Sequence, residues 1–152
     1  MPDRVDSMLQ MVSGLSYIHF KGFVHRDIKA DNVLISSSTN RVQLKISDFG
    51  LSKEATASGS FSLTSGVKGT RLYYAAELLR LEDEQGNEGN EGEPHNTGII
   101  RGNVSSDVFA LGCLFYGLVT KGKHPFSDGR GRFFIPENII KGRFNLDDTD
   151  GI

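Results

Sequence analysis

The fold of this chain is decided by residues 25–50, which read HRDIKADNVLISSSTNRVQLKISDFG. Near the start of this stretch Asp27 and Asn32 lie five positions apart, with Lys29 between them. Two apolar runs follow, and the polar residues 37–40 between them predict the turn of a β-hairpin. A hairpin would return the chain so that Asp48 faces the loop that carries Asp27 and Asn32.

These residue types match the requirements of phosphoryl transfer from a nucleotide. A carboxylate must orient the attacking hydroxyl and accept its proton, oxygen ligands must hold Mg²⁺ against the phosphates, and a cation must balance charge on the transferred group. Asp27 fits the first requirement, Asn32 and Asp48 fit the second, and Lys29 fits the third. Hard oxygen ligands of this kind favour Mg²⁺ over zinc, which prefers several histidine or cysteine ligands.

A helix is predicted upstream of this stretch, from Arg4 to Phe20, with Asp3 as its N-cap and Gly22 as its stop. Its apolar face is expected to follow a 3.6-residue period through Val5, Met8, Leu9, Val12, Leu15, Ile18 and His19. Short strands are predicted over Phe23–Val24, Val33–Ser36 and Val42–Ile46.

Downstream, Leu51 to Gly69 is rich in small polar residues and predicts a long loop. Ala75 to Leu81 predicts a short helix. Residues 82–93 read EDEQGNEGNEGE, and we expect them to form a disordered acidic insertion that extends to about residue 100.

Two further helices are predicted in the last third of the chain. One begins with a serine cap at Ser105 or Ser106, runs to Val119, and is apolar on almost every side, so we expect it to be the buried central helix. The other is weaker and runs from about Pro136 to Lys141.

Composition is that of an ordinary globular chain of 152 residues, with 38% hydrophobic and 24% charged residues. A net charge of −2 gives no general attraction to nucleic acid or to an anionic membrane. The single cysteine, Cys113, cannot form an internal disulfide, so nothing suggests an oxidising compartment and a cytosolic location is expected. No apolar run reaches the ~20 residues that a membrane-spanning helix needs.

The pattern H-R-D-x-K-x-x-N followed by D-F-G resembles the catalytic and magnesium-binding loops of eukaryotic protein kinases. The resemblance implies an α+β fold, the mainly helical C-terminal lobe of a kinase, with a small β-hairpin carrying the catalytic loops. It implies Asp27 as the base, Lys29 as the phosphate contact, and Asn32 and Asp48 as the Mg²⁺ ligands, with ATP as the phosphate donor. Lys29, two residues after Asp27, is typical of kinases that phosphorylate serine and threonine.

Under this resemblance residues 51–70 are the activation loop, and several other residues acquire structural or regulatory roles. His25 packs beneath the catalytic loop, Arg26 grips a phosphate on the activation loop, Phe49 packs to position Asp48, and Asp107 anchors the catalytic loop. Gly50, Thr70 and Glu77 complete the matched motifs, although Ala76 replaces the proline that usually precedes this glutamate. The remaining histidines, at positions 19, 95 and 124, are isolated, and we assign them no chemistry.

The activation loop carries four candidate phosphorylation sites, Ser60, Ser62, Thr64 and Ser65. A flexible polar loop would have the same composition. In a kinase, however, each phosphate would add about −1.5 to −2 charges that could pair with Arg26 or Lys53.

Finer features are similar to the inositol-requiring sensor kinase/endoribonuclease of the unfolded protein response. They are the runs SFSLTSGVKGT over 60–70, GCLFY over 112–116, GKHPF over 122–126 and NIIKG over 138–142. The resemblance implies that residues 1–152 are part of a kinase domain whose glycine-rich loop and final helices lie outside the chain, so negligible activity is expected of the chain alone. It also implies a homodimer that phosphorylates itself, on the cytosolic side of the endoplasmic reticulum membrane.

Two alternatives remain open on the sequence. A non-catalytic, pseudokinase-like scaffold would explain Ala76, although the four residues with chemical roles are intact. A second alternative is a nucleotide-sensing regulator of an attached ribonuclease.

Overall fold

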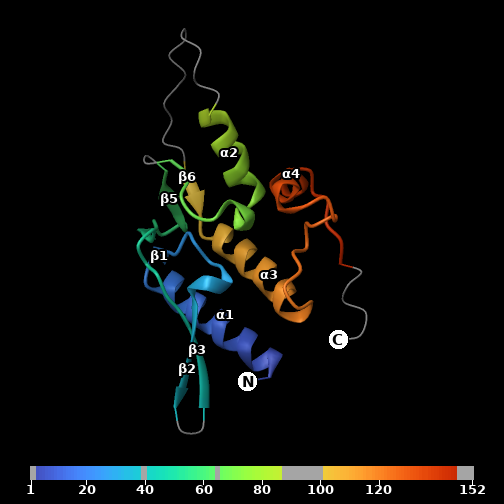
Figure 1. The fold of residues 1–152 in the computed structure, drawn as a ribbon. Coiled ribbons are helices and arrows are strands. Elements are labelled where there is room, and N and C mark those ends of the chain that lie inside the picture. The colour runs from blue at the N-terminus through green and yellow to red at the C-terminus, as the bar shows by residue number, and fades with distance from the viewer. Residues whose placement is uncertain (1–2, 39–40, 64–65, 87–100, 147–152) are drawn as a thin grey trace.

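The computed structural model describes residues 3–38, 41–63, 66–86 and 101–146. Two long helices, α1 (Arg4–Phe20) and α3 (Ser105–Val119), pack against each other in its centre, as Figure 1 shows. A β-hairpin lies against α1, and two shorter helices, α2 (Ala76–Gly86) and α4 (Ile135–Ile140), pack together at the other side of α3. The mainly helical architecture with a small hairpin confirms the predicted fold class.

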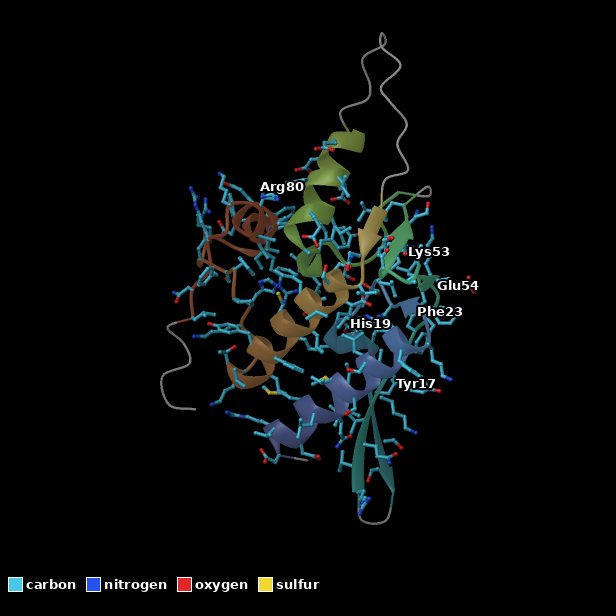
Figure 2. The ribbon with its side chains drawn as sticks, turned by 180° about the vertical axis from the view of Figure 1, so that it is seen from behind. Tyr17, His19, Phe23, Lys53, Glu54 and Arg80 are labelled. Carbon is cyan, nitrogen blue, oxygen red and sulfur yellow. The ribbon has the colours of Figure 1, made fainter. Side chains whose placement is uncertain are left out.

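Helix α1 has the predicted bounds, but its buried face is only partly the predicted one. The Asp3 carboxylate accepts a hydrogen bond from the backbone N–H of Val5 at 3.2 Å, so the N-cap is confirmed. Buried residues follow the line Ser7, Met11, Leu15 and Ile18. The predicted stripe is wrong at Val5, Leu9 and Val12, which are 60%, 59% and 42% exposed, because periodicity marks apolar positions without showing which of them a neighbouring element covers. Figure 2 shows Tyr17 and His19 near the end of this helix, close to the strand that carries Phe23.

The predicted hairpin is confirmed, with longer strands. Strand β2 (Val33–Ser38) pairs with β3 (Arg41–Ile46) in antiparallel register from Val33 opposite Ile46 to Ser38 opposite Arg41. Ser37 and Ser38, predicted as turn residues, therefore belong to β2, and positions 39–40 lie outside the described residues. One face of the hairpin packs with α1 and α3 in an apolar cluster of Met11, Leu15, Ile28, Val33, Leu44, Ile46, Ala110 and Leu111.

Residues 51–69 are not the continuous loop that the sequence predicts. Strand β4 (Lys53–Glu54) pairs with β1 (Phe23–Val24), and β5 (Ser60–Ser62) pairs with β6 (Arg101–Asn103). Close packing explains the glycine at position 102, since a Cβ there would lie 2.2 Å from Cζ of Phe61. The sequence does not predict strands β4 and β5, because both are short and polar and pair with segments that are distant in the sequence.

Helix α2 begins one residue later than predicted and continues to Gly86, so the start of the acidic segment is helical and not disordered. Two ion pairs support this extension, from Arg71 to Glu82 and to Asp83. Positions 87–100 of the predicted insertion lie outside the described residues. Helix α4 starts at Ile135, one residue earlier than predicted, and follows a 3₁₀ turn, η3 (Arg132–Phe134).

Helix α3 lies in the centre of the fold, as predicted, although it is not buried on every side. Its buried positions are Ser106, Asp107, Ala110, Leu111, Cys113 and Tyr116, whereas Val108 is 56% exposed. The start at Ser105 is confirmed, but Val104 occupies the N-cap, without a side-chain cap. Within the described residues, no helix is long and apolar enough to cross a membrane.

A second apolar cluster joins α2, α4 and strand β5, and Leu79 on α2 is completely buried in it. Leu79→Ala should lower the free energy of unfolding by about 2–5 kcal/mol, because it removes transfer energy and leaves a cavity. Leu9→Ala on the exposed face of α1 is the matched control, and it should cost less than about 0.5 kcal/mol. Urea denaturation of both variants measures this difference; equal losses would contradict the assignment of the core.

Candidate active site

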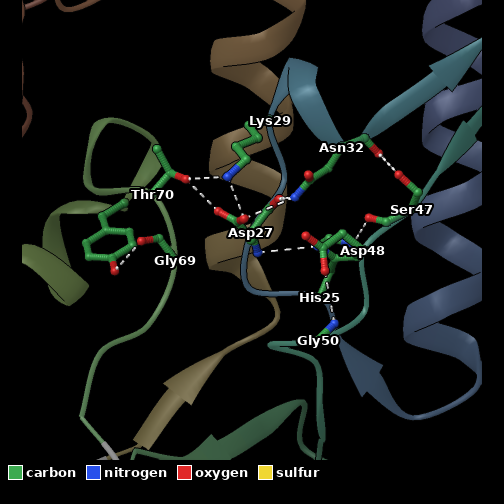
Figure 3. A network of polar contacts seen from close by, with 10 residues as sticks. His25, Asp27, Lys29, Asn32, Ser47, Asp48, Gly50, Gly69 and Thr70 are labelled. Carbon is green, nitrogen blue, oxygen red and sulfur yellow. Dashed lines mark hydrogen bonds and ion pairs between the residues drawn. The ribbon is translucent and has the colours of Figure 1, made fainter.

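Asp27 lies at the centre of a compact polar network, shown in Figure 3. Its carboxylate is 7% exposed, and both oxygens accept hydrogen bonds. Oδ1 accepts from the Thr70 hydroxyl at 2.7 Å, and Oδ2 accepts from Lys29 Nζ at 2.8 Å and from Asn32 Nδ2 at 3.0 Å. The Lys29 ammonium also donates to Thr70 Oγ1 at 2.9 Å, which closes a triangle of three side chains.

The network fixes the charge of Asp27. Burial alone would raise the pKa of this carboxyl, but the hydrogen bonds from Lys29 and Thr70 outweigh burial and hold the pKa below its ordinary value. The Lys29 pKa moves in the opposite direction and is raised, chiefly by its bond to Asp27. The site therefore presents an ionised carboxylate beside an ammonium group at neutral pH.

Asn32 and Asp48 bring oxygen ligands from two segments to the same region. Asn32 is buried at the end of the 3₁₀ turn η1 (Ala30–Asn32), and its Nδ2 donates to the Asp27 carbonyl at 2.8 Å as well as to the carboxylate. Because both amide hydrogens are used in this way, Oδ1 is left as an acceptor. Asp48 is exposed, and its Oδ1 accepts from the backbone N–H of Gly50 at 3.3 Å.

These donors fit Mg²⁺, which binds through one or two protein oxygens and completes its shell with phosphate and water. Among the residues that the structure describes, no three histidine, cysteine, aspartate or glutamate side chains are grouped to hold a metal by themselves. The fit is therefore to a metal that arrives with a polyphosphate and not to a closed protein cage.

His25 joins the two segments that carry these ligands. Its fully buried ring donates from Nε2 to the Ser47 carbonyl at 2.9 Å, and Nδ1 accepts from the Asp27 N–H at 3.3 Å. These contacts lie beneath the loop, where the resemblance implies that His25 packs. Phe49 contacts the His25 ring edge-on, with 5.1 Å between the ring centroids, and is 52% exposed.

Asp107 anchors the catalytic loop to α3. This 2% exposed carboxylate accepts from two consecutive backbone N–H groups, those of His25 and Arg26, each at 2.8 Å. Arg26 has a φ of 72°, a strained conformation for a residue with a side chain, and the two bonds hold it there. Oδ2 also lies 2.9 Å from Nε2 of His19, which must carry the hydrogen because an ionised carboxylate only accepts.

His19 is a residue that sequence reasoning missed. As an isolated histidine it has no assigned chemistry in the sequence analysis, and its partner Asp107 lies 88 positions away in the sequence. A histidine on the last turn of a helix just before a catalytic loop is the signal that could have identified it. Of the other histidines set aside, His95 lies outside the described residues, and His124 is half-buried against Tyr73 and Phe126.

Arg26 contacts the backbone of the loop that follows Asp48. Its guanidinium donates to the carbonyls of Leu51 at 3.3 Å and Gly66 at 3.4 Å, and it lies 5.3 Å from the ring centre of Phe61. Burial lowers the pKa of this group from its very high ordinary value. The side chain thus bridges the two ends of the loop.

Gly69 sets the position of Thr70 beside Asp27. Its φ is +131°, and a Cβ at this position would lie 2.3 Å from the carbonyl oxygen of Arg26. The Tyr74 hydroxyl donates to the Gly69 carbonyl at 3.1 Å. Ala76 then begins α2 at a position where proline is favoured but alanine is also suitable, and Glu77 is exposed in the first turn.

The predicted phosphorylation sites are only partly described. Ser60 and Ser62 lie in β5, while positions 64 and 65 lie outside the described residues. The Ser60 hydroxyl hydrogen-bonds with those of Thr56 at 2.8 Å and Ser58 at 3.2 Å. Lys53 Nζ donates to the carbonyl of Ser62 at 3.0 Å, so a cation lies close to this site.

Asp107→Asn tests whether this carboxylate anchors the loop. The two N–H groups of His25 and Arg26 donate to different oxygens of Asp107, and in asparagine one of these oxygens is replaced by an NH2 group, which cannot accept. We expect a loss of about 1–3 kcal/mol in stability and faster hydrogen exchange at the amides of His25 and Arg26. Asp31→Asn changes an exposed carboxylate of the same loop and should leave both amides protected. Unchanged exchange in the Asp107 variant would contradict the anchoring role of this carboxylate.

Comparison with known proteins agrees with this geometry. Residues 3–145 match the protein kinase domain family. The chain is 36% identical over 163 residues to the serine/threonine-protein kinase/endoribonuclease ireA of Aspergillus fumigatus, a match that covers 96% of the chain and 14% of that relative. It is 36% identical to the human serine/threonine-protein kinase/endoribonuclease IRE2, over 88% of the chain and 13% of the relative.

A third relative, a sensor for unfolded proteins in the ER from Schizosaccharomyces pombe, is 32% identical over 95% of the chain and 14% of its own length. The chain thus spans about one seventh of each of these relatives. The family match includes the loops that carry Asp27, Asn32 and Asp48. This chain belongs to the protein kinase family.

Proposed function

We propose that this chain supplies the catalytic loops of a kinase that transfers the γ-phosphate of ATP to serine or threonine of proteins. The observation that carries the proposal is the placement of Asp27, whose buried carboxylate is held ionised by Lys29 and Thr70. A scaffold without chemistry has no need for a buried carboxylate with this set of partners.

Each residue has a distinct task in the proposed reaction. Asp27 Oδ1 accepts one hydrogen bond, from Thr70, and keeps a second lone pair to orient the acceptor hydroxyl and take its proton. Lys29, bound to the other oxygen, faces the transferred phosphate as a balancing charge. Asn32 and Asp48 would hold Mg²⁺, which neutralises charge on the phosphates when it is bound.

The positions of Lys29 and Thr70 support hydroxyl acceptors of the serine and threonine type. These two side chains bond to each other and to Asp27, so the acceptor enters beside a small polar group and an ammonium. The names of the similar proteins from Aspergillus and human also specify serine/threonine kinases.

The same relatives support a finer proposal for the whole protein. Their names couple a kinase to an endoribonuclease, and one names a sensor for unfolded proteins in the ER. We infer a sensor kinase/endoribonuclease that forms homodimers at the cytosolic face of the endoplasmic reticulum. In such a dimer one copy would phosphorylate Ser60, Ser62, Thr64 or Ser65 of the other. Lys53, beside Ser62, could then form an ion pair with the new phosphate.

The nucleotide-sensing alternative is distinguished by what each activity requires. If the kinase fold only reports nucleotide binding to an attached ribonuclease, then RNA cleavage should depend on nucleotide but survive the loss of the base. If phosphate transfer is required, both activities should fall together in the same variant.

Asp27→Asn in the full-length protein should lower phosphate incorporation by about 10²- to 10⁴-fold, the range typical of a lost general base. Asn has nearly the same size and shape and keeps one acceptor oxygen, which can still accept from Thr70, so the fold should persist, as circular dichroism would show. Asp6→Asn, an exposed carboxylate on α1, serves as the control with full activity. Undiminished incorporation of radiolabelled phosphate by the Asp27 variant would refute the proposed role.

Thr70→Val should move the acidic limb of the pH–rate profile to higher pH. Asp27 must be ionised to act, so activity is lost as pH falls through its pKa, and that pKa is held low partly by the Thr70 hydroxyl. Valine removes this donor, and the pKa rises. Thr70→Ser keeps the hydroxyl and should retain the original limb; identical profiles for valine and threonine would exclude this contribution.

A further inference from the structure

A groove leads away from the catalytic network toward Arg132 and Arg143. A cavity of about 610 Å³ begins at Asp31 and Thr70, beside the acceptor position, and is walled by apolar residues, among them Leu72, Tyr73, Leu114 and Leu118. A second cavity of about 630 Å³ continues to Arg143 and Asn145. The two share five lining residues, Gly122, Lys123, His124, Arg132 and Ile135, so they adjoin along these residues.

The part of the groove distant from Asp27 is positively charged. Lys123, Arg132 and Arg143 line it, and all three are exposed. The carboxylate on the same wall, Asp128, is balanced by Arg130 at 2.6 Å and accepts from Asn138 at 2.9 Å.

The basic residues lie within reach of a polypeptide whose hydroxyl is at Asp27. Tyr73 is joined to Thr70 by a backbone hydrogen bond of 2.9 Å, and its ring lies 5.9 Å from that of His124, which lines both cavities. An extended segment advances about 3.3 Å per residue. Positions a few residues from the acceptor would therefore meet Lys123 and Arg132.

We propose that this groove selects protein substrates with an anionic residue a few positions from the acceptor serine or threonine, and that Lys123, Arg132 and Arg143 are the specificity residues. The inference rests on the proposed kinase function and adds its substrate class. Apolar contacts next to the acceptor, followed by three cations, fit an extended segment that carries an apolar and then an acidic or phosphorylated residue.

Peptide kinetics on the full-length protein test the proposal. A serine peptide with glutamate placed in turn at each of the five positions on either side should be phosphorylated with a kcat/KM about tenfold higher at one or more positions than its glutamine counterpart. The advantage should shrink as salt is raised. A phosphoserine series distinguishes the two sources of negative charge. Equal rates for glutamate, glutamine and lysine peptides would overturn the inference while leaving the kinase function intact.

Reversing the charge of the groove gives a test that a misfolded variant would fail, because a misfolded protein would lose activity toward all peptides and would not change its preference. The double variant Lys123→Glu, Arg132→Glu should prefer lysine-containing peptides, and Arg132→Gln should weaken the preference for glutamate without reversing it. Arg4→Glu, an exposed residue at the start of α1 outside both cavities, is the matched control and should keep the original preference. A double variant that still prefers glutamate would exclude Lys123 and Arg132 as the cause.

A binding measurement separates this inference from failure of the proposed function. With Asp27→Asn, a fluorescent acidic peptide should bind more tightly than its neutral counterpart by anisotropy, and the difference should be lost in the charge-reversed background. If no peptide is phosphorylated, the kinase proposal fails, and this measurement still decides whether the groove recognises anionic segments. Equal affinity for the acidic and neutral peptides would reject the groove.

Discussion

A single buried carboxylate holds the site together. Asp107 stands in the first turn of α3, where the helix dipole favours negative charge, and it accepts from two adjacent backbone N–H groups of the catalytic loop. Directly after these two N–H groups the backbone takes an uncommon conformation, the positive φ of Arg26. The carboxylate stabilises this conformation, and Asp27 follows immediately from it.

The neighbourhood of Asp27 shows how charge is balanced in a confined volume. One ammonium, one hydroxyl and one amide converge on its two oxygens, so the carboxylate remains ionised although it is buried. The same amide leaves its oxygen available for a cation. In the proposed function this oxygen and the carboxylate of Asp48 would together hold Mg²⁺.

The sequence predicted the elements whose information is local. Helix α1 and the hairpin are marked by periodicity and turn residues, and the structure confirms both. Features that depend on distant partners were missed. The β5–β6 pair requires Gly102 to lie under Phe61, and His19 acquires its partner only when α1 packs against α3. The predicted buried face of α1 is partly wrong for the same reason, because burial of Val5 and Leu9 would require a neighbouring element that covers them.

The pairing of β5 with β6 has a consequence for how the acidic segment can vary. Helix α2 fixes one end of this segment at Gly86, and β6 fixes the other at Arg101, shortly before the start of α3. Both ends are therefore held by elements that pack into the described fold. Insertion or deletion between Gly86 and Arg101 should leave these two supports in place, because neither depends on the number of residues that separate them.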